Sequence, residues 1–341
     1  MQRCIDLSKK GLRAAMPNPC VGAVIVHNNK IIGEGFTAAF GGPHAEVNAI
    51  ASVKDPSLLP ESTIYVSLEP CSHFGKTPPC CDLIIEKKIP RVVIGMMDPF
   101  AAVSGAGILK LIQAGRQVKV GVLEDSCYES NKRFFTFHQK NRPFILLKWA
   151  QTADHFMAPA KKDVQAPVWI SNSYSLQRAH QMRAENMAIL VGTQTVVDDN
   201  PSLTTRDWQG QNPLRIVLDR TGRLTGKLHV LDQSTPTLII TENEELASGE
   251  NLNYALLKFD DSFLTNLMQL LYQKNIQSII VEGGKKTLDL FIQQNLWDEA
   301  WVFNSKNKFV EGIPSPTLPT SPCKEEELGD NVLQIYKNTN R

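Results

Sequence analysis

The sequence predicts a protein of two domains, each a layered α/β structure. Its 341 residues are enough for two domains of ordinary size. In both halves, short apolar runs typical of strands alternate with segments of helical periodicity. This alternation is typical of a sheet covered by helices. No internal repeat relates the two halves.

The first domain, expected over residues 1–124, contains five strand-like runs and four helical segments. The last helix begins after the Ser104-Gly105 turn and is stopped by Gly115. The expected strands are Val21–Val26, Lys30–Phe36, Thr63–Leu68, Arg91–Met96 and Gln117–Val122. The expected helices span about 2–15, 44–53, 79–88 and 105–114.

The stretch 125–142 is polar, charged and aromatic, and we interpret it as a linker that partly packs. Arg142-Pro143 then opens the second domain, 143–341, with the buried-looking strand Phe144–Leu147. The segment Gly312–Cys323 is rich in Pro, Ser and Thr and is expected to be a loop. The other expected strands are Ala188–Val191, Leu214–Leu218, Thr237–Ile240, Ser278–Val281 and Ala300–Phe303.

Charge and composition argue against several classes of protein. The 36 Lys and Arg balance the 35 Asp and Glu without a block of like charge, which argues against a general binder of nucleic acid or membrane surfaces. No apolar run is long enough to span a bilayer. The first residues lack the basic-then-apolar form of a signal peptide. The seven cysteines are therefore best explained as reduced thiols and metal ligands in a cytoplasmic protein.

One histidine, one glutamate and two cysteines form the most informative pattern in the chain. His44 and Glu46 are followed by Glu69-Pro70-Cys71, and eight residues separate Cys71 from Cys80. The histidine and the two cysteines can fill three corners of a zinc tetrahedron and leave the fourth for water. This order is the signature of zinc nucleoside and nucleobase deaminases. It predicts hydrolytic removal of an amino group from a pyrimidine-like or purine-like ring.

The chemistry assigns a separate role to the glutamate. Zinc can lower the pKa of its water to about 7, and we expect Glu46 to pass the water proton to the ring nitrogen and the leaving ammonia. His44 and Glu46 fall at the expected start of a helix, and Cys80 falls at another. The alternative, that these are unrelated structural residues, requires every motif position to agree by coincidence. Cys81 is a rival ligand, but the spacing favours Cys80.

These motifs resemble one family in particular, the bifunctional riboflavin biosynthesis deaminase–reductases. The gap between the cysteines is longer than the two-residue gap usual in cytidine and tRNA adenosine deaminases, and the resemblance covers nearly the whole chain. In the first half the matching motifs are Pro17–Val24, Glu69–Cys80 and Asp98-Pro99. In the second half they are Arg142-Pro143-Phe144 with Lys148, Trp169-Ile170-Ser171, Met182-Arg183-Ala184, Asp199–Arg206 and Val281-Glu282-Gly283-Gly284.

The resemblance implies a cytidine-deaminase-like domain followed by a dihydrofolate-reductase-like domain. The first would use zinc to deaminate 2,5-diamino-6-(5-phosphoribosylamino)pyrimidin-4-one, and the second would use NADPH to reduce the ribose to a ribityl chain. The chain has no Gly-x-Gly-x-x-Gly fingerprint, which argues against a standard dinucleotide-binding fold. Instead, Gly283 and Gly284 lie between an expected strand and the helix Lys285–Asn295, where phosphate could approach free N–H groups.

The resemblance also implies which residues hold the pyrimidine ribotide in the first domain: Asn18, His73, Lys76 and Asp98. Each has a plainer alternative role. Asn18 and Asp98 each lie beside a proline and could form a turn, and Lys76 could be a solvated loop residue. The family usually has histidine at the position of Thr37, and threonine lacks the imidazole.

In the second domain the resemblance implies two sets of residues. Lys148 and the arginines could also be explained by ion pairs, since a lysine on a buried strand is costly unless it is paired or functional. The NADPH site would be lined by Ala150, Trp169, Thr195, Asp199, Gly283 and Gly284. The substrate would be faced by Lys148, Arg183, Leu203, Arg206 and Glu282.

Two departures from the family pattern affect the second domain. Asp154-His155 stands where the family has Asp-Gly, so a bulky side chain is expected to crowd that turn, and residues 304–316 lack the usual Ala-Pro-Lys pattern. They favour one alternative, a deaminase whose second domain is not catalytic. A silent scaffold is disfavoured by the intact zinc motif, and an RNA-editing deaminase by the cysteine spacing and the charge balance. A homo-oligomer formed through the second domain is a further hypothesis.

Overall fold

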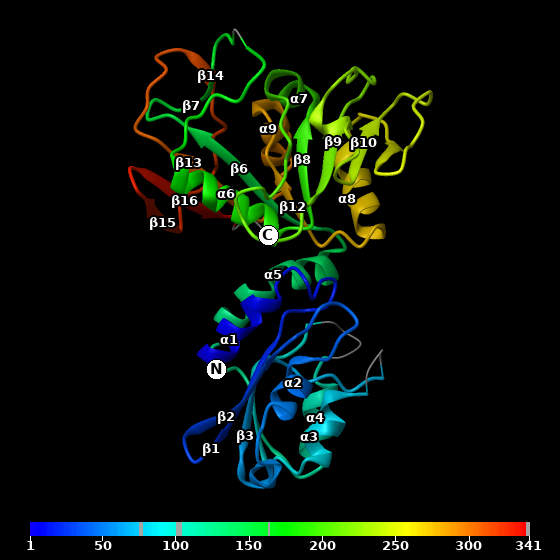
Figure 1. Ribbon diagram of the computed structural model, residues 1–341, viewed down its shortest axis with the longest axis vertical. Helices are drawn as coiled ribbons and strands as arrows, with labels where there is room; N and C mark the ends of the chain where they lie inside the picture. Colours follow the sequence, from blue (N-terminus) through cyan, green and yellow to red (C-terminus); the bar gives the residue numbers. More distant parts are fainter. Residues whose placement is uncertain (75–77, 100–103, 163, 339–341) are drawn as a thin grey trace. The chain divides into compact units, whose positions relative to one another are not determined.

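The computed structural model describes residues 1–74, 78–99, 104–162 and 164–338 (Figure 1). It divides into two compact units, Met1–Asn141 and Arg142–Arg341. Each unit contains its own sheet and its own hydrophobic core.

The first unit contains a five-stranded mixed sheet. Its strand order is β2-β1-β3-β4-β5, in which β1 is antiparallel to β2 and β3, while β3, β4 and β5 are parallel. Asn28 and Asn29 close the β1–β2 hairpin with positive φ angles of 46° and 60°, as a two-residue hairpin loop requires. The strands are β1 (Gly22–His27), β2 (Lys30–Phe36), β3 (Thr63–Leu68), β4 (Arg91–Met96) and β5 (Gln117–Lys119).

Helices cover both faces of this sheet. In Figure 1, α2, α3 and α4 lie on one face, and α1 and α5 lie on the other. The core between them contains Ile64, Ile84, Ile94 and Leu111, all fully buried. The helices are α1 (Gln2–Ser8), α2 (Ala45–Ala51), α3 (Cys80–Glu86), α4 (Ala106–Gln113) and α5 (Glu124–Lys140), and 3-10 turns span Lys9–Gly11 and Pro56–Glu61.

The stretch 125–142, which we interpreted as a linker, is mostly helix α5 of the first unit. Its buried residues Cys127, Asn131 and Phe135 are four positions apart and form one stripe along the helix. A Cβ atom on Gly95 of β4 would lie 2.3 Å from Sγ of Cys127, so α5 packs directly on the sheet. The many charged residues on the other helix face concealed this stripe in the sequence.

The second unit contains a nine-stranded sheet that is mostly parallel. Its strand order is β11-β10-β9-β8-β12-β6-β13-β16-β15. The first seven of these strands run parallel to their neighbours, and β16 and β15 add antiparallel at one edge. The strands are β6 (Phe144–Gln151), β8 (Ala188–Gly192), β9 (Leu214–Leu218), β10 (Thr237–Thr241), β11 (Leu252–Leu256), β12 (Ser278–Val281), β13 (Glu299–Asn304), β15 (Lys324–Leu328) and β16 (Asn331–Lys337).

Two hydrophobic clusters sandwich this sheet. Leu267 of α8 and Phe291 of α9 pack on one face, and Met182 of α6 and Val196 of α7 pack on the other. Both faces are therefore covered, as expected of a parallel sheet. The helices are α6 (Ser173–Glu185), α7 (Thr193–Asp199), α8 (Phe263–Gln273) and α9 (Lys285–Gln293), and a 3-10 turn spans His229–Leu231.

Several expected boundaries differ from the structure. The first helix was expected to reach residue 15, but α1 ends at Ser8 and continues only as a 3-10 turn. The segment Gly312–Cys323, expected to be entirely loop, includes the short strand β14 (Gly312–Pro314), which pairs with β7 (Phe156–Pro159). Such short strands carry almost no periodic signal of their own, because their pairing depends on a partner far away in the sequence.

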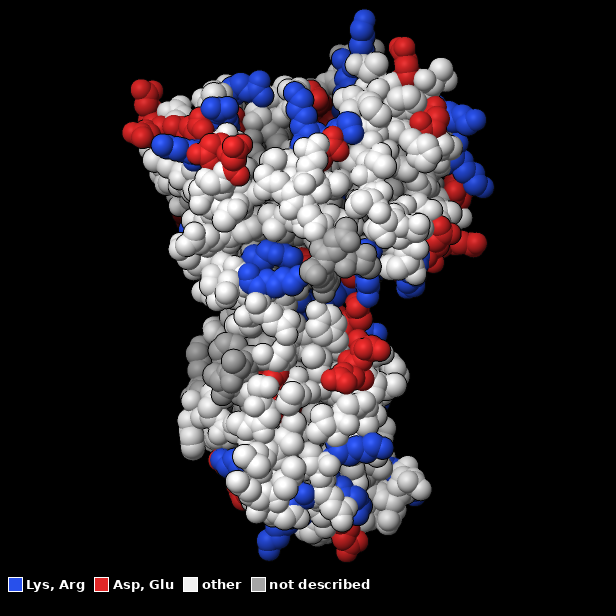
Figure 2. All heavy atoms as spheres, turned by 180° about the vertical axis from the view of Figure 1, so that it is seen from behind, with Lys and Arg blue, Asp and Glu red and all other residues white. Residues whose placement is uncertain are grey.

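No helix in the described part of the chain has both the length and the apolar character that a membrane crossing needs. On the face shown in Figure 2, acidic and basic side chains are interspersed over both units. The highly charged strand β15 lies at the edge of the large sheet. Charges at such an edge discourage pairing with strands of other molecules.

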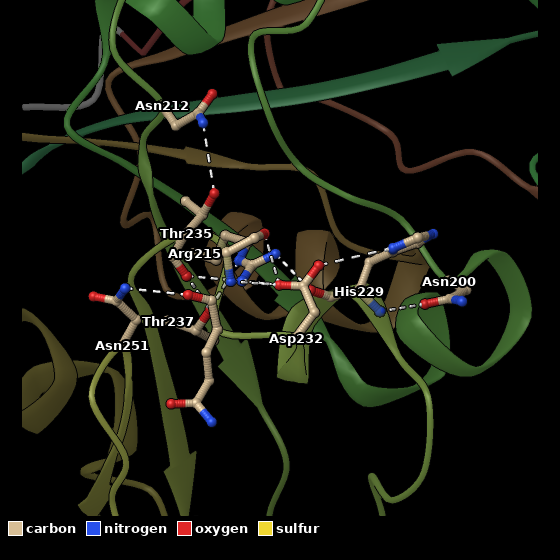
Figure 3. A network of polar contacts seen from close by, with 10 residues as sticks. Asn200, Asn212, Arg215, His229, Asp232, Thr235, Thr237 and Asn251 are labelled. Carbon is tan, nitrogen blue, oxygen red and sulfur yellow. Dashed lines mark hydrogen bonds and ion pairs between the residues drawn. The ribbon is translucent and has the colours of Figure 1, made fainter.

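A fully buried arginine organises the turns at one end of β9 and β10 (Figure 3). Arg215 donates from Nε to Thr237 Oγ1 at 2.8 Å and from Nη1 to the His229 carbonyl at 2.6 Å. Its Nη2 donates to the Thr235 carbonyl at 2.7 Å and to Asp232 Oδ1 at 3.1 Å. A buried guanidinium is tolerated only when its donors are satisfied in this way.

We predict that Arg215→Met lowers the free energy of unfolding by about 3 kcal/mol, because it leaves buried carbonyls without donors. Urea denaturation followed by circular dichroism measures the loss. Arg220→Met is the matched control: Arg220 is 60% exposed and pairs with Glu242, so its loss should stay within about 0.5 kcal/mol. Equal effects of the two substitutions would contradict the prediction.

Candidate functional site

Three metal-ligand side chains of the first unit converge on one point. His44 immediately precedes α2, Cys80 begins α3, and Cys71 follows the end of β3. Nδ1 of His44 lies 3.6 Å from Sγ of Cys71 and 3.4 Å from Sγ of Cys80. All three ligand atoms lie within 4.8 Å of one another. The structure therefore brings together the three ligands that the sequence suggested.

The spacing of these atoms fits a tetrahedral zinc ion. A Zn–N bond of about 2.0 Å and a Zn–S bond of about 2.3 Å at a tetrahedral angle place ligand atoms roughly 3.5 Å apart. The two distances from His44 Nδ1 agree with this value. One imidazole nitrogen and two sulfurs form a donor set suited to zinc, and the fourth corner stays open, as a catalytic site requires.

Hydrogen bonds prepare one thiol of the cluster to ionise. Contacts from the side chain of Cys80, from His44 and from the Cys80 backbone N–H hold the pKa of Cys71 at about 4. The Cys80 N–H donates to Cys71 Sγ at 3.3 Å. The interaction with Cys71 raises the pKa of Cys80 and of His44. Both cysteines bind a metal as thiolates, so metal binding at this cluster releases protons.

Glu46 lies in the first turn of α2, and its side chain is buried. Burial, with the charge of Cys71 as the next cause, raises the pKa of Glu46 to about 7. A carboxyl group with such a pKa can both accept and donate a proton near neutral pH. Glu46 can thus shuttle protons beside the metal ligands without being one of them.

Cys81, the rival ligand, points away from the cluster. Its thiol donates to the carbonyls of Pro70 at 3.2 Å and Gly107 at 3.5 Å. Burial raises its pKa to about 12. Cys81 is therefore a neutral thiol that packs the start of α4 against the segment before Cys71.

The residues expected to hold the substrate in the first unit lie at three places in the chain. Asn18 is half-buried in the turn before β1, Asp98 is buried just after β4, and His73 is exposed after Cys71. Lys76 lies outside the described residues. Asp98 and Cys71 both follow the carboxyl ends of neighbouring parallel strands, which places them at the same edge of the sheet.

Glu69 organises this edge, although the sequence analysis gave it no role. Its buried carboxylate accepts N–H bonds from Asp98 at 3.1 Å, Gly105 at 3.0 Å and Gly107 at 2.9 Å. It also accepts from Ile108 at 3.3 Å. Because Glu69 lies two residues before the ligand Cys71, one carboxylate ties the metal site to Asp98 and to the start of α4. A charged residue that ends a buried strand was the signal that could have identified it.

Thr37, where the family has histidine, has a definite contact of its own. It is buried, and its Oγ1 accepts the Val21 N–H at 2.9 Å, while its own N–H donates to the Val21 carbonyl at 3.0 Å. Thr37 therefore pairs with the start of β1, next to the turn that carries Asn18.

In the second unit, one cleft of about 1200 Å³ is lined by every residue that the sequence assigned to the reductase half. The cleft lies where β8, β9 and β12 end at their carboxyl termini. Such an edge is the usual ligand site of a parallel sheet. The eleven residues are Lys148, Ala150, Trp169, Arg183, Thr195, Asp199, Leu203, Arg206, Glu282, Gly283 and Gly284.

The charge of this cleft suits anionic ligands. Eight cationic side chains line it against four carboxylates. A cleft lined mostly by one sign of charge attracts ligands of the opposite sign. The cations are Lys148, Lys162, Arg183, Arg206, Arg220, Arg223, Lys285 and Lys286, and the carboxylates are Asp198, Asp199, Glu282 and Asp289.

Glu282 is the centre of a largely buried charge cluster on the wall of the cleft. Its Oε2 lies 2.8 Å from Nη2 of Arg183 and 3.8 Å from Nζ of Lys148. Burial opposes ionisation, but the charges of Arg183 and Lys148 hold the pKa of Glu282 at about 2. Burial and the charge of Arg183 lower the pKa of Lys148. The lysine in the apolar run of β6 is therefore paired, as its position demands.

The start of α9 forms the part of the cleft suited to phosphate. Gly284 caps the helix, and its N–H donates to Thr195 Oγ1 at 3.1 Å. A Cβ atom on Gly283 would lie 2.5 Å from Cβ of Thr287, so a larger residue does not fit there. Lys285 and Lys286 follow in the first turn. The positive end of a helix dipole and two cations together suit a phosphate group.

The other predicted residues lie on different walls of the cleft. Asp199, at the end of α7, forms an ion pair with Lys162, which the sequence analysis did not single out. Arg206 is partly exposed, Trp169 is exposed and Leu203 is buried with φ of 58°. Ala150 lies on β6, two residues after Lys148.

The turn at His155 accommodates its bulky residue. His155 has φ of 61°, the left-handed conformation that glycine adopts most easily. Its side chain lies 3.1 Å from Nε2 of Gln151, so the imidazole is held by a neighbouring strand residue. The carboxylate of Asp154 accepts the N–H groups of Phe309 and Val310, which ties the segment 304–316 to this turn.

Comparisons with known proteins agree with a zinc site in the first unit and a reductase cleft in the second. Residues 1–96 match the family model described as cytidine and deoxycytidylate deaminase zinc-binding region, and residues 143–305 match the RibD C-terminal domain. The chain is 37% identical to the riboflavin biosynthesis protein RibD of Aquifex aeolicus, over 99% of this chain and 97% of that one. It is 34% identical to RibD of Escherichia coli, over 89% of this chain and 86% of that one.

Solved structures show the same arrangement. A diaminohydroxyphosphoribosylaminopyrimidine deaminase/5-amino-6-(5-phosphoribosylamino)uracil reductase from Thermotoga maritima superposes with a TM-score of 0.90 at 38% identity, covering 99% of this chain and 97% of that chain. RibD of Acinetobacter baumannii superposes with a TM-score of 0.85 at 27% identity, covering 98% and 96%. The predicted pair of a cytidine-deaminase-like and a dihydrofolate-reductase-like domain is confirmed. The alternative of a non-catalytic second domain is wrong, because that domain is a reductase domain.

We predict that Cys80→Ser abolishes zinc binding and that Cys81→Ser preserves it. The first substitution removes a sulfur of the ligand cluster, and the second removes only a thiol that donates to carbonyls. Metal analysis of the purified variants should give near zero and about one zinc per chain, respectively. A zinc-free Cys81→Ser protein that is still folded would contradict the assignment.

Proposed function

Because the chain belongs to the family of the riboflavin biosynthesis protein RibD, we propose that it performs two successive reactions on one pyrimidine ribotide. The first unit hydrolyses one of the two amino groups of 2,5-diamino-6-(5-phosphoribosylamino)pyrimidin-4-one. The reaction consumes water, releases ammonia and gives the corresponding uracil. The second unit then reduces the ribose of the uracil product to a ribityl chain with NADPH. The observation that carries the proposal is the cluster of His44, Cys71 and Cys80 beside the buried Glu46.

In the deaminase site the protein positions the ligands and moves protons. Bound zinc supplies an activated water for attack on the ring carbon that carries the amino group. Glu46 takes a proton from this water and delivers it to the ring nitrogen and the departing ammonia. Asn18 and Asp98 bind the pyrimidine or the ribose, and His73 and Lys76 donate to the sugar phosphate.

In the reductase site the cationic cleft binds two phosphorylated molecules. NADPH supplies a hydride. Gly283 and Gly284 at the start of α9 would hold its phosphates, and Ala150, Trp169, Thr195 and Asp199 would line the rest of its site. Arg183 and Arg206 bind the phosphate of the substrate, beside Leu203. Glu282 holds Lys148 and Arg183 in place, as their ion pairs indicate.

We place this protein in the cytoplasm as a homo-oligomer formed through the second unit. All seven cysteines are free, which suits a reducing compartment. Light scattering of the purified protein at working concentration tests this oligomeric state. A molar mass equal to that of the monomer would contradict it.

We predict that adding the diaminopyrimidine ribotide causes NADPH oxidation only when zinc is present. Treatment with a chelator should stop both ammonia release and NADPH oxidation, and added zinc should restore them, because reduction follows deamination. Glu46→Gln should keep zinc but slow ammonia release by about a thousandfold. The same variant should still oxidise NADPH when given the deaminated uracil ribotide. Ammonia release at the normal rate by Glu46→Gln would refute the role of this residue.

We also predict that Glu282→Gln impairs only the second reaction. The amide cannot neutralise Lys148 and Arg183, so NADPH oxidation with the uracil ribotide should fall by about tenfold to a hundredfold, while ammonia release stays unchanged. Glu326→Gln on the edge strand β15 is the matched control, since Glu326 pairs with Lys324 and Arg178 and is not among the residues that line the cleft. Unchanged reduction by Glu282→Gln would rule out the proposed role.

A further inference from the structure

We infer that Asn131 of α5 is a positioning residue for the substrate-binding turn of the deaminase, an inference that rests on the function proposed above. The Asn131 side chain pairs with the backbone of Cys20 through both of its polar atoms. The Cys20 N–H donates to Asn131 Oδ1 at 2.7 Å, and Asn131 Nδ2 donates to the Cys20 carbonyl at 3.0 Å. Both residues are buried, each about 4% exposed. The amide thus pairs with Cys20 as a neighbouring strand would.

The turn needs this outside support because it has few hydrogen-bond donors of its own. Pro17 and Pro19 flank Asn18, and proline has no N–H group. The Asn18 N–H bonds locally, to the Ala15 carbonyl at 2.9 Å. The Cys20 N–H and carbonyl are bonded to Asn131. The position of Asn18 therefore depends on α5.

A second side chain holds the same backbone from the other side. Thr37 Oγ1 accepts the Val21 N–H at 2.9 Å. The loop from Thr37 to Pro43 leads directly to the ligand His44, and the Phe40 N–H in this loop donates to the Ala14 carbonyl at 2.9 Å. Hydrogen bonds thus connect both sides of the turn that carries Asn18 with the loop before the metal ligand.

Asn131 acts through Asn18 and not on the substrate. Its amide is buried, and both of its polar atoms are used by Cys20. Only a side chain that donates and accepts in one plane can make this pair. Asp has the same shape but cannot donate when ionised, so its oxygen would face the Cys20 carbonyl with no hydrogen between them.

The first experiment is steady-state kinetics of ammonia release by Asn131→Asp. We expect KM for the diaminopyrimidine ribotide to rise about tenfold or more, with kcat changed less than about threefold and zinc at about one per chain. Ser130→Ala is the matched control, because the Ser130 hydroxyl donates within α5, to the Ser126 and Cys127 carbonyls. An unchanged KM with full zinc would overturn the inference.

The second experiment does not depend on activity. Hydrogen exchange of the peptide covering residues 12–22 should be faster in Asn131→Asp than in the wild type, and unchanged in Ser130→Ala. Equal exchange in all three proteins would overturn the inference even if KM rises. If Asn131→Asp does not fold with zinc, Asn131→Ser replaces it: serine is neutral and too short to bond both polar groups of Cys20, so it should raise both KM and exchange. A wild-type protein that releases no ammonia would defeat the proposed function, while the exchange data would still decide whether Asn131 holds the turn.

Discussion

Parallel pairing of strands determines where both sites lie. In a parallel sheet all carboxyl ends meet at one edge, and the segments that follow them are free to carry ligands. In the first unit the parallel strands β3 and β4 end just before Cys71 and Asp98. In the second unit β8, β9 and β12 end at one cleft. Residues far apart in sequence therefore come together because the strands that precede them are paired. No local sequence motif is needed for this.

Buried charges then fix the geometry of those edges. Glu69 accepts hydrogen bonds from four backbone N–H groups, and Glu282 forms ion pairs with two cations. Arg215 donates hydrogen bonds to the turns around His229 and Thr235. Glu69 and Arg215 are buried, Glu282 is largely buried, and each has several partners, as the cost of an unpaired buried charge requires. Such a group favours one arrangement of the segments it joins, because any other arrangement leaves donors or acceptors unpaired. The same logic extends to the neutral amide of Asn131.

The sequence was most informative where chemistry and position coincide within a short segment. His44 with Glu46, and Cys71 with Cys80, could be assigned because zinc and proton transfer demand those residue types at those spacings. Most strands of the two sheets were found because apolar runs mark them. The edge strands β11 and β15, and β16 beside β15, were missed because β15 is highly charged and β11 and β16 are only partly buried.

The supporting residues could not be predicted for a different reason. Asn131 meets Cys20 across 111 positions, and Arg142 meets Asp298 across 156. A polar residue inside a charged segment gives no sign that it is buried, so the helix that contains Asn131 was interpreted as a linker. The helical stripe of Cys127, Asn131 and Phe135 contains only two apolar residues, which is too few to distinguish it from a partly packed linker.

Two of the three departures from the family pattern, at Thr37 and at His155, show how backbone contacts absorb a change of side chain. Thr37 is bonded to Val21 by its backbone N–H as well as by its hydroxyl, so the loop before His44 is held by an atom that every residue except proline carries. At the second departure the Asp154 carboxylate, not the neighbouring side chain, receives the N–H groups of Phe309 and Val310. His155 needs only a left-handed backbone, which costs a non-glycine residue on the order of 1 kcal/mol. That cost is small compared with the contacts that fix the turn, so the change of residue leaves the architecture of the reductase domain in place.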